Sequence, residues 1–564
     1  MQKTFFLLFS VSIFFSLKTY CQNITLKING ANGLETKKID SLNYLKLHKD
    51  YKSLQEEVNN LQEKLLKDGY LETYLNEIKK VNDTSYTAKI YIKRKYDFIT
   101  VYYNKNTIPK TVLEIVSNKI NDTYFEIPIK KIEESLNYIN SKIAALGMPF
   151  SKVKLSNIRN EEPNKLKANL VVIKGNKKRF IDDVVIKGYE KFPKSYLNHF
   201  LKIKKKQIFN LKTINNKIER LNDLRFANQI KPPEVLFSKD STSLYLYLEK
   251  SQSNSFDGFL GFGTNDKTNK LEFDGYLNLN LVNNLNFGET FKLIYKSDEN
   301  DQNTFETNLT LPYILKSPIG LDLQLHIFRR DSSFSTTKQS IKVHYQINSK
   351  HKVYAGTSNI KSNNLLSPST INQINDFNTN YYSLAYNFIK PQSNNLLFPV
   401  NTSFFMESNF GKRENNSSTE KQSLLYVDAF NIINFNTKNS IYVRVNASKL
   451  SSESYFENEL LRFGGINSIR GFEENSILAS QYGLINAEFR YQLNNSIFIH
   501  TITDAAYFEN KLTNTNEKLF GYGFGLGILT KSGLLKLNYA NGKNEKQKFK
   551  LSNSKIHISL KAHF

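Results

Sequence analysis

Few residues in this chain have the types and spacing that covalent chemistry needs. The eight histidines among the 564 residues are scattered, and none has a partner at the four-residue spacing of a helical metal site. Cys21 is the single cysteine, which excludes an internal disulfide or zinc–thiolate site. One glycine-rich segment is similar in spacing to a phosphate-binding loop, and it contains Gly258, Gly261 and Gly263. This segment lies in an alternating strand with no helix after it, which argues against phosphate binding. We therefore predict no catalytic group, metal site or cofactor, and no enzyme.

A better candidate for a specific polar contact is the segment 459–473, ELLRFGGINSIRGFE. Its glycine pair breaks the chain, and its arginine follows in a long predicted loop. Arg470 is either a solvated loop residue, as most loop arginines are, or a buried one that must be paired, because an unpaired buried charge costs several kcal/mol. The nearest lumen-facing carboxylates of later strands are predicted to be Asp504 and Glu488. The candidate loop residues are Gly464, Gly465, Ser468, Ile469, Arg470, Gly471 and Phe472.

The elements that must position this loop are β-strands. From residue 253 to 564, runs with period-two alternation are separated by turns rich in Asn, Ser, Lys and Gly, and we count about sixteen. A soluble sandwich or propeller would also alternate. The last strand favours an outer-membrane barrel, because one face is wholly apolar and the chain ends on an aromatic residue. That face consists of Ile556, Ile558, Leu560, Ala562 and Phe564.

Ahead of the barrel, a mixed pattern of helices and strands recurs. Leu54, Val58, Leu61 and Leu65 fall on one helical face, and a second helix with the same periodicity precedes Gly147. Such repetition predicts an array of small modules, each reading strand, helix, helix, strand, strand, with a three-stranded sheet covered on one face. The alternative is one continuous α+β domain. The predicted modules are residues 22–103, 104–178 and 179–252.

Composition and the N-terminus indicate the compartment. Lys3 followed by the apolar run 5–17 has the pattern of a signal peptide covering residues 1–21, removed before Gln22. The alternative, a lipidated Cys21, lacks the small residues of a lipobox. The net charge of +25 is spread over every segment, so we expect no nucleic-acid partner. With a mean hydropathy of −0.46 and no later apolar run of about 18 residues, a helical membrane protein is excluded.

These features together resemble the BamA/TamA superfamily of outer-membrane assembly and translocation barrels, also called the bacterial surface antigen family. The resemblance covers the modules, the barrel, the GGINSIRGF loop and the glycine-alternating strand GYGFGLG at 521–527. It implies tandem α+β POTRA modules in the periplasm, followed by an all-β transmembrane barrel of sixteen antiparallel strands in the outer membrane of a Gram-negative bacterium. The three modules look most like the TamA branch.

The resemblance also implies the site residues. Arg470 would fold back into the lumen and pair with Asp504, and with Glu488 beside it. The family strand carries Phe-x-Asp-x-Gly, which this chain matches at Asp504 but not at Ile502 or Ala506. A loose seam between the first and last barrel strands would act as a lateral gate for client strands. The predicted gate residues are Phe256, Gly258, Gly261, Gly263, Ile556, Ile558, Leu560 and Phe564.

The function expected from the resemblance is insertion or passage of client proteins at the outer membrane. The expected partners are unfolded or partly folded outer-membrane proteins and outer-membrane lipid, with accessory lipoproteins or an inner-membrane protein as further candidates. Two alternatives stay open. One is a pore dedicated to a single exported protein, and the other is a passive porin that keeps a steady conductance when residues 459–473 are deleted.

Overall fold

The structure is a computed structural model, and it describes residues 23–175, 177–264, 271–297, 302–366, 373–392, 395–530, 533–545 and 554–563. The predicted signal peptide, including Cys21, and the terminal Phe564 lie outside the described residues. The chain forms two compact units. One runs to Phe180 and includes Ile208–Leu211, and the other holds Ile181–Gln207 and the rest of the chain.

The first module is a four-stranded sheet in the order β2-β1-β4-β3, with β1 and β4 parallel. The apolar face of α3 packs on the sheet through Leu54, Val58, Leu61 and Leu65, all fully buried. Asp50 caps this helix by accepting the backbone N–H of Ser53 at 2.7 Å. The elements are β1 (Ile24–Asn29), α2 (Gly33–Asp40), β2 (Leu47–His48), α3 (Tyr51–Lys67), β3 (Tyr74–Asn82) and β4 (Ser85–Tyr91).

The second module repeats this plan in the order β6-β5-β8-β7, with β5 and β8 parallel. Its core is formed by Ile139 and Ile143 of α5 against Ile99, Val101 and Phe125 of the sheet. The elements are β5 (Phe98–Tyr102), α4 (Lys110–Val116), β6 (Tyr124–Pro128), η1 (Ile129–Lys131), α5 (Ile132–Ala145), β7 (Lys152–Glu162) and β8 (Lys165–Ile173).

Two details of the predicted modules differ from the structure. The first two sheets have four strands rather than three, because the short β2 and β6 add to an edge. The segment 98–102 was assigned to the first module, but as β5 it pairs with β6 and β8 of the second. The strand that completes the first sheet is β3, whose mostly exposed residues give little alternation to detect.

The third module has a three-stranded sheet in the order β10-β11-β9, with β9 and β11 parallel. It belongs to the same compact unit as the barrel. The elements are β9 (Asp183–Gly188), the π-helical turn η2 (Tyr196–Phe200), α6 (Leu211–Ile218), η3 (Glu219–Asp223), β10 (Ala227–Phe237) and β11 (Thr242–Lys250).

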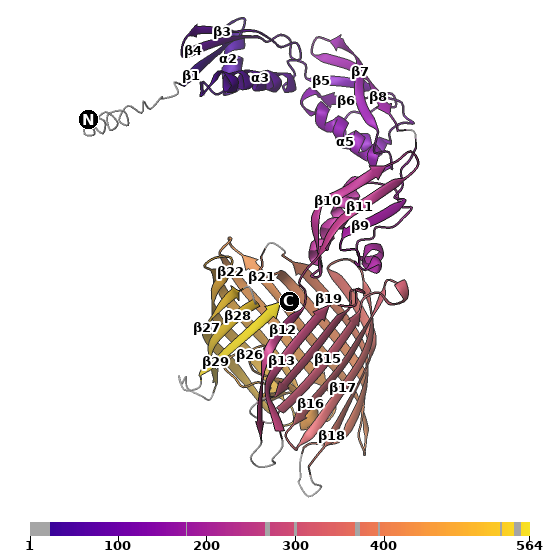
Figure 1. Ribbon diagram of the computed structural model, residues 1–564, viewed down its shortest axis with the longest axis vertical. Coiled ribbons are helices and arrows are strands. Elements are labelled where there is room, and N and C mark those ends of the chain that lie inside the picture. Colours follow the sequence, from indigo (N-terminus) through magenta and orange to yellow (C-terminus); the bar gives the residue numbers. More distant parts are fainter. Residues whose placement is uncertain are drawn as a thin grey trace, which may run out of the picture. The chain divides into compact units, whose positions relative to one another are not determined.

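The rest of the chain forms a closed barrel of sixteen strands, as predicted, and every neighbouring pair is antiparallel (Figure 1). Along β26 every second side chain is buried and faces inward, while Ile499 and Tyr507 face outward. The barrel strands are β12 (Ser255–Thr264), β13 (Leu271–Val282), β14 (Thr290–Ser297), β15 (Gln302–Leu311), β16 (Ile319–Arg330), β17 (Phe334–Gln346), β18 (His351–Asn364), β19 (Phe377–Pro391), β20 (Val400–Glu414), β21 (Thr419–Asn434), β22 (Asn439–Ser451), β25 (Gln481–Gln492), β26 (Ile497–Asn510), β27 (Thr515–Thr530), β28 (Gly533–Asn544) and β29 (Ser554–His563).

A long loop joins β22 to β25 and carries the candidate site. It contains the short helix η5 (Glu457–Glu459) and a two-stranded hairpin, β23 (Leu461–Phe463) with β24 (Ile477–Ala479). At the opposite end of the barrel the connections are short, and one of them holds the helix η4 (Ile314–Lys316). No helix among the described residues has the length and apolarity to span a membrane.

Candidate functional site

The loop tip is a compact turn held by its own polar groups. Gly464 and Gly465 have φ of 116° and 95°, which only glycine adopts without strain. The N–H of Gly464 donates to Ser468 Oγ at 3.1 Å, and Asn486 Nδ2 on β25 donates to the Ser468 carbonyl at 2.8 Å. Ile469 is fully buried in a cluster with Phe463 and Leu484. The turn therefore presents Arg470 to the wall of the barrel.

Arg470 makes a bidentate ion pair with Asp504 of β26. Its Nε lies 2.8 Å from Oδ2, its Nη2 lies 2.6 Å from Oδ1, and its backbone N–H also donates to Oδ2 at 3.0 Å. Its Nη1 donates to Glu488 of β25. Asp504 is only 1% exposed, so this charge is almost fully withdrawn from solvent. The structure thus brings together the three charged residues that the sequence singled out.

A second arginine completes this network and was missed in the sequence. Arg490 donates from Nε to the other carboxylate oxygen of Glu488 at 2.8 Å. Its guanidinium also lies over the rings of Tyr442 and Phe398, at 4.0 and 4.5 Å from their centroids. The signal was present, because Arg490 is two residues from Glu488 on the same face of a strand. Glu488 is therefore shared between a loop arginine and a wall arginine.

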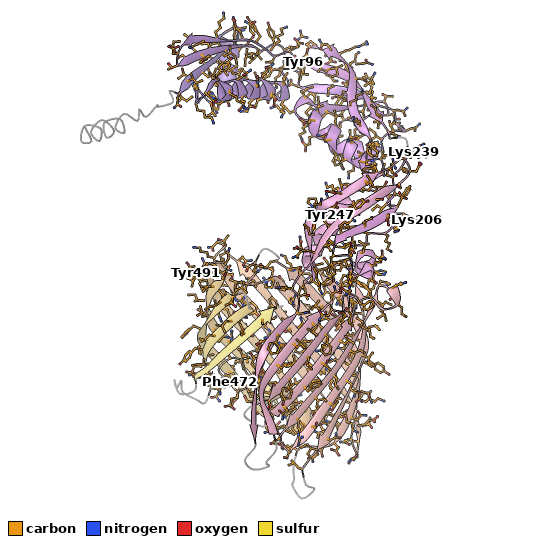
Figure 2. All side chains as sticks on the ribbon, in the orientation of Figure 1. Tyr96, Lys206, Lys239, Tyr247, Phe472 and Tyr491 are labelled. Atoms are coloured by element: carbon orange, nitrogen blue, oxygen red, sulfur yellow. The ribbon has the colours of Figure 1, made fainter. Side chains whose placement is uncertain are left out.

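Glycines of the late strands make room for the loop tip. A Cβ on Gly521 of β27 would lie 2.4 Å from the Arg470 carbonyl oxygen. A Cβ on Gly542 of β28 would lie 2.5 Å from the carbonyl oxygen of Gly471 and 2.9 Å from the Phe472 ring. Figure 2 shows Phe472 at the level of the barrel strands. The close approach of the loop tip to Gly521 explains part of the GYGFGLG pattern, because no residue with a side chain fits opposite Arg470.

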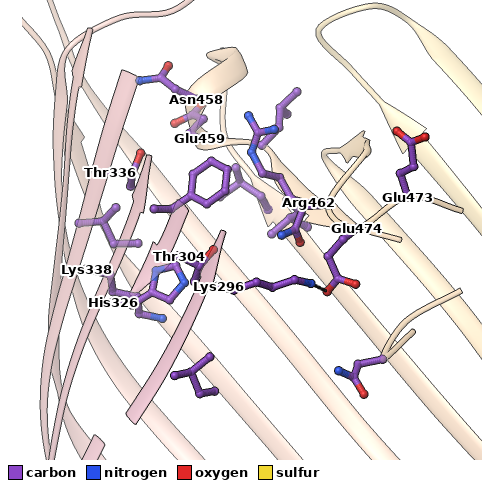
Figure 3. Close-up of a pocket in the computed structure, with 18 of the residues that line it drawn as sticks. Lys296, Thr304, His326, Thr336, Lys338, Asn458, Glu459, Arg462, Glu473 and Glu474 are labelled. Carbon is purple, nitrogen blue, oxygen red and sulfur yellow. Dashed lines mark ion pairs between the residues drawn. The ribbon is translucent and has the colours of Figure 1, made fainter. Parts of the chain in front are cut away.

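Two acidic residues just after the tip reach strands on either side of the seam. Glu474 forms an ion pair with Lys296 of β14 at 2.9 Å, drawn in Figure 3, and Glu473 forms one with Lys555 of β29 at 3.3 Å. β29 is one of the two strands of the junction with β12, and β14 lies two strands beyond β12 on the other side of it. We call Glu473, Glu474, Lys296 and Lys555 the clasp. Nothing in the sequence pattern paired these residues.

The seam itself is short. Among the residues that the structure describes, β12 and β29 are paired through three residue pairs, Ser255 with His563, Phe256 with Ala562 and Asp257 with Lys561. By contrast, β12 pairs with β13 through ten residue pairs, and β28 with β29 through nine. Gly258, with φ of 153°, comes directly after the last of the three seam pairs.

The other predicted gate residues lie beyond these three pairs. Gly261 and Gly263 pair with Asp274 and Glu272 of β13, so they lie on an edge without a β29 partner in the described register. Ile556 and Leu560 are exposed, and Ile558 pairs with Leu537 of β28. Phe564 lies outside the described residues.

The lumen beside the loop holds a cavity of about 1330 Å³ with a mixed lining. Lys296, His326, Lys338 and Arg462 contribute cationic or polar side chains (Figure 3). Phe328, Ile360 and Phe377 contribute apolar ones. Within the described residues, no group of three or more His, Cys, Asp and Glu side chains could hold a metal ion. The arrangement offers contact surfaces and a backbone edge rather than reacting groups.

A comparison of the sequence with models of protein families shows which family the chain belongs to. The model of the Omp85 superfamily domain matches residues 262–560, more than half of the chain. The chain belongs to the Omp85 superfamily. A second model, the surface antigen variable number repeat or POTRA, matches residues 180–250, which contain the third module. The protein is thus an outer-membrane β-barrel with POTRA structure ahead of it on the periplasmic side.

Solved structures agree on the fold at low sequence identity. BamA from Haemophilus ducreyi lacking POTRA domains 1–3 is 14% identical, with a TM-score of 0.50, covering 82% of this chain and 99% of its own. CdiB from Acinetobacter baumannii (14%, TM-score 0.52) and CdiB from Escherichia coli (12%, TM-score 0.53) each cover 91% of this chain and 97% of their own. No curated protein matches the chain by sequence.

Proposed function

We propose that this protein assembles other β-barrel proteins into the outer membrane, and that client strands enter through a lateral gate between β12 and β29. The observation that carries the proposal is the three-pair seam, compared with nine or ten pairs at the neighbouring junctions. Backbone groups beyond Gly258 then remain free to pair with an added strand. Membership of the Omp85 superfamily supports an assembly or secretion role of this kind.

The proposed partners follow from the same mechanism. Clients are unfolded or partly folded outer-membrane proteins, which supply the added strand, and outer-membrane lipid receives the product. Three periplasmic POTRA modules would hold clients or accessory proteins, with the first boundary placed before β5. Strand addition needs neither a catalytic group nor a cofactor, because hydrogen bonding and burial drive it.

A cross-linked seam tests the gate. Phe256→Cys and Ala562→Cys place thiols on opposed residues, and the chain has no cysteine after Cys21 to compete. The matched control is Leu325→Cys with Gln339→Cys, opposed residues on β16 and β17. The readout is the outer-membrane proteome of cells that depend on each variant, with and without reductant.

We expect oxidation of the seam pair to reduce many barrel proteins together, and reductant to restore them, while the control pair has no effect. Loss of one exported protein with other barrels unchanged would replace the proposal with a dedicated translocator. Normal assembly through a fully cross-linked seam would exclude the lateral gate.

A further inference from the structure

The barrel turns at the end where β12 begins expose large apolar side chains. This is the periplasmic end, since the third module leads into it. Each of the six turns described there contains at least one such residue, and these turns are 283–289, 312–318, 347–350, 392 with 395–399, 435–438 and 493–496. Leu315 is 95% exposed, Leu396 75%, Phe287 70% and Phe435 61%. Among the described loop residues of the other end, Leu365 alone is comparably exposed. Among the residues that the structure describes, the apolar exposure is therefore concentrated at this rim.

Three of these six turns also carry a lysine. Lys316, Lys350 and Lys438 are exposed within them, and Lys202 of the third module reaches this rim, where its Nζ donates to the Ile347 carbonyl at 3.3 Å. The single acid in the six turns is Glu289, which is buried and accepts the N–H groups of Leu285 and Phe287. At the opposite end, exposed acids such as Asp331 and Asp376 occur in the loops.

We propose that this rim is a binding surface for the anionic phospholipids of the periplasmic leaflet. Apolar turn residues would enter the region between acyl chains and headgroups, and the adjacent ammonium groups would contact lipid phosphates. Tyr491, at the same rim in Figure 2, has the amphipathic ring that favours this depth. The residues are distributed over turns all round the barrel, which matches a continuous lipid surface better than one docked protein.

Depth of the turns is the first measurement. The chain has no tryptophan, so Leu315→Trp and Phe435→Trp each introduce a single reporter, on turns separated by several strands. In bilayers with lipids brominated at defined depths, both reporters should be quenched most strongly by bromine near the headgroup. Leu236→Trp is the control and should not be quenched, because it is exposed on the third module and pairs with Ser243 at the end of β11 that lies away from the barrel. Unquenched reporters would overturn the proposal and favour an aqueous partner, and quenching of one alone would limit the surface to one sector.

Lipid selectivity is the second measurement, made on the full chain in mixed bilayers with spin-labelled phosphatidylglycerol or phosphatidylcholine. The triple variant Lys316→Gln, Lys350→Gln, Lys438→Gln should lower the preference for phosphatidylglycerol by about threefold, as should high salt. The matched control is Lys412→Gln, Lys421→Gln, Lys511→Gln, exposed lysines at the opposite end. Heat-dependent gel mobility checks that both fold. An unchanged preference, or an equal loss in the control, would overturn the role of the turn lysines.

Discussion

At the scale of single residues, Arg470 makes four hydrogen bonds to two carboxylates of the barrel wall. Its guanidinium and backbone N–H together satisfy both oxygens of Asp504, and one further N–H reaches Glu488. Such a pair is weak evidence for stability, because desolvation offsets much of the attraction. Its main effect is on geometry, since the planar fork fixes where the loop tip lies on the wall.

Removing this arginine should therefore lower the free energy of unfolding by more than the ion pair contributes to it. Arg470→Ala leaves Asp504 buried without its partner, and we expect a loss of about 3–5 kcal/mol in the free energy of unfolding. Denaturant unfolding of the refolded barrel, followed by gel mobility, measures it. The double variant Arg470→Met, Asp504→Asn removes both charges and should recover at least part of the loss, because Arg490 still holds Glu488. No recovery would mean that the loss has another origin.

The glycine opposite the loop offers a second residue-level prediction. Gly521→Ala places a methyl group 2.4 Å from the Arg470 carbonyl oxygen, so the loop tip must move away from β27. We expect trypsin to cleave after Arg470 about tenfold faster, as the tip opens locally. Gly483→Ala on β25 is the control, because its Cβ would meet nothing within 4 Å. Equal cleavage in both variants would contradict the close approach.

At the scale of elements, the clasp should control how often the seam opens. Each of its ion pairs is partly exposed and worth about 0.5–1 kcal/mol. Glu473→Gln with Glu474→Gln should favour the open seam about fivefold, because 1.4 kcal/mol corresponds to a factor of ten. Single-channel recordings in planar bilayers count the openings.

The control and the salt series separate this effect from a general change in charge. Glu545→Gln removes an exposed partner of Lys518 at 3.6 Å and should leave the opening frequency unchanged. Raising the salt to 1 M should make the wild type resemble the clasp variant, because exposed ion pairs are screened. Identical frequencies in all three conditions would show that the clasp does not hold the seam.

The alternation of apolar and polar residues along a strand can be read from a short stretch of sequence. It is therefore sufficient to predict sixteen barrel strands, the loop and the inward-facing Asp504 and Glu488. Sheet membership is not local, so the predicted boundary after residue 103 leaves β5 in the wrong module, and the mostly exposed residues of β3 show no alternation that would predict a strand. The clasp joins Glu473 and Glu474 to strands far apart in the sequence. Which strands a loop inside a barrel reaches depends on strand stagger, which a single sequence does not reveal.

At the scale of the whole molecule, the third module is attached to the barrel by tyrosines. Tyr196 donates to the Gly288 carbonyl at 3.2 Å and packs edge-on against Tyr313, with ring centroids 5.0 Å apart. Burial raises the pKa of Tyr196, so its phenol stays neutral and can donate. Tyr189 accepts from Asn283 Nδ2 at 2.6 Å. The module and the barrel are therefore joined by side chains as well as by the connecting chain.

Loosening this contact should broaden the range of module positions. Tyr196→Ala removes both the hydrogen bond and the ring contact, and spin labels at Lys239→Cys and Lys350→Cys would report a wider distance distribution in pulsed EPR. Tyr247→Ala is the control, because this tyrosine contacts Glu234 and Lys231 of its own module. A distribution as narrow as that of the wild type would show that other contacts position the module.

The loop tip also makes the barrel mechanically unequal around its circumference. One short segment touches β25, β26, β27 and β28 in succession, through Glu488, Asp504, Gly521 and Gly542, and Glu473 extends the contact to β29. The loop tip therefore ties these five strands together, and we expect them to bend as one unit rather than separately. On the other side of the seam, Glu474 pairs with Lys296 of β14, and Glu457 of the same loop pairs with Arg330 of β16. An incoming strand that pushes on the seam should deform the first strands and leave the last ones in place.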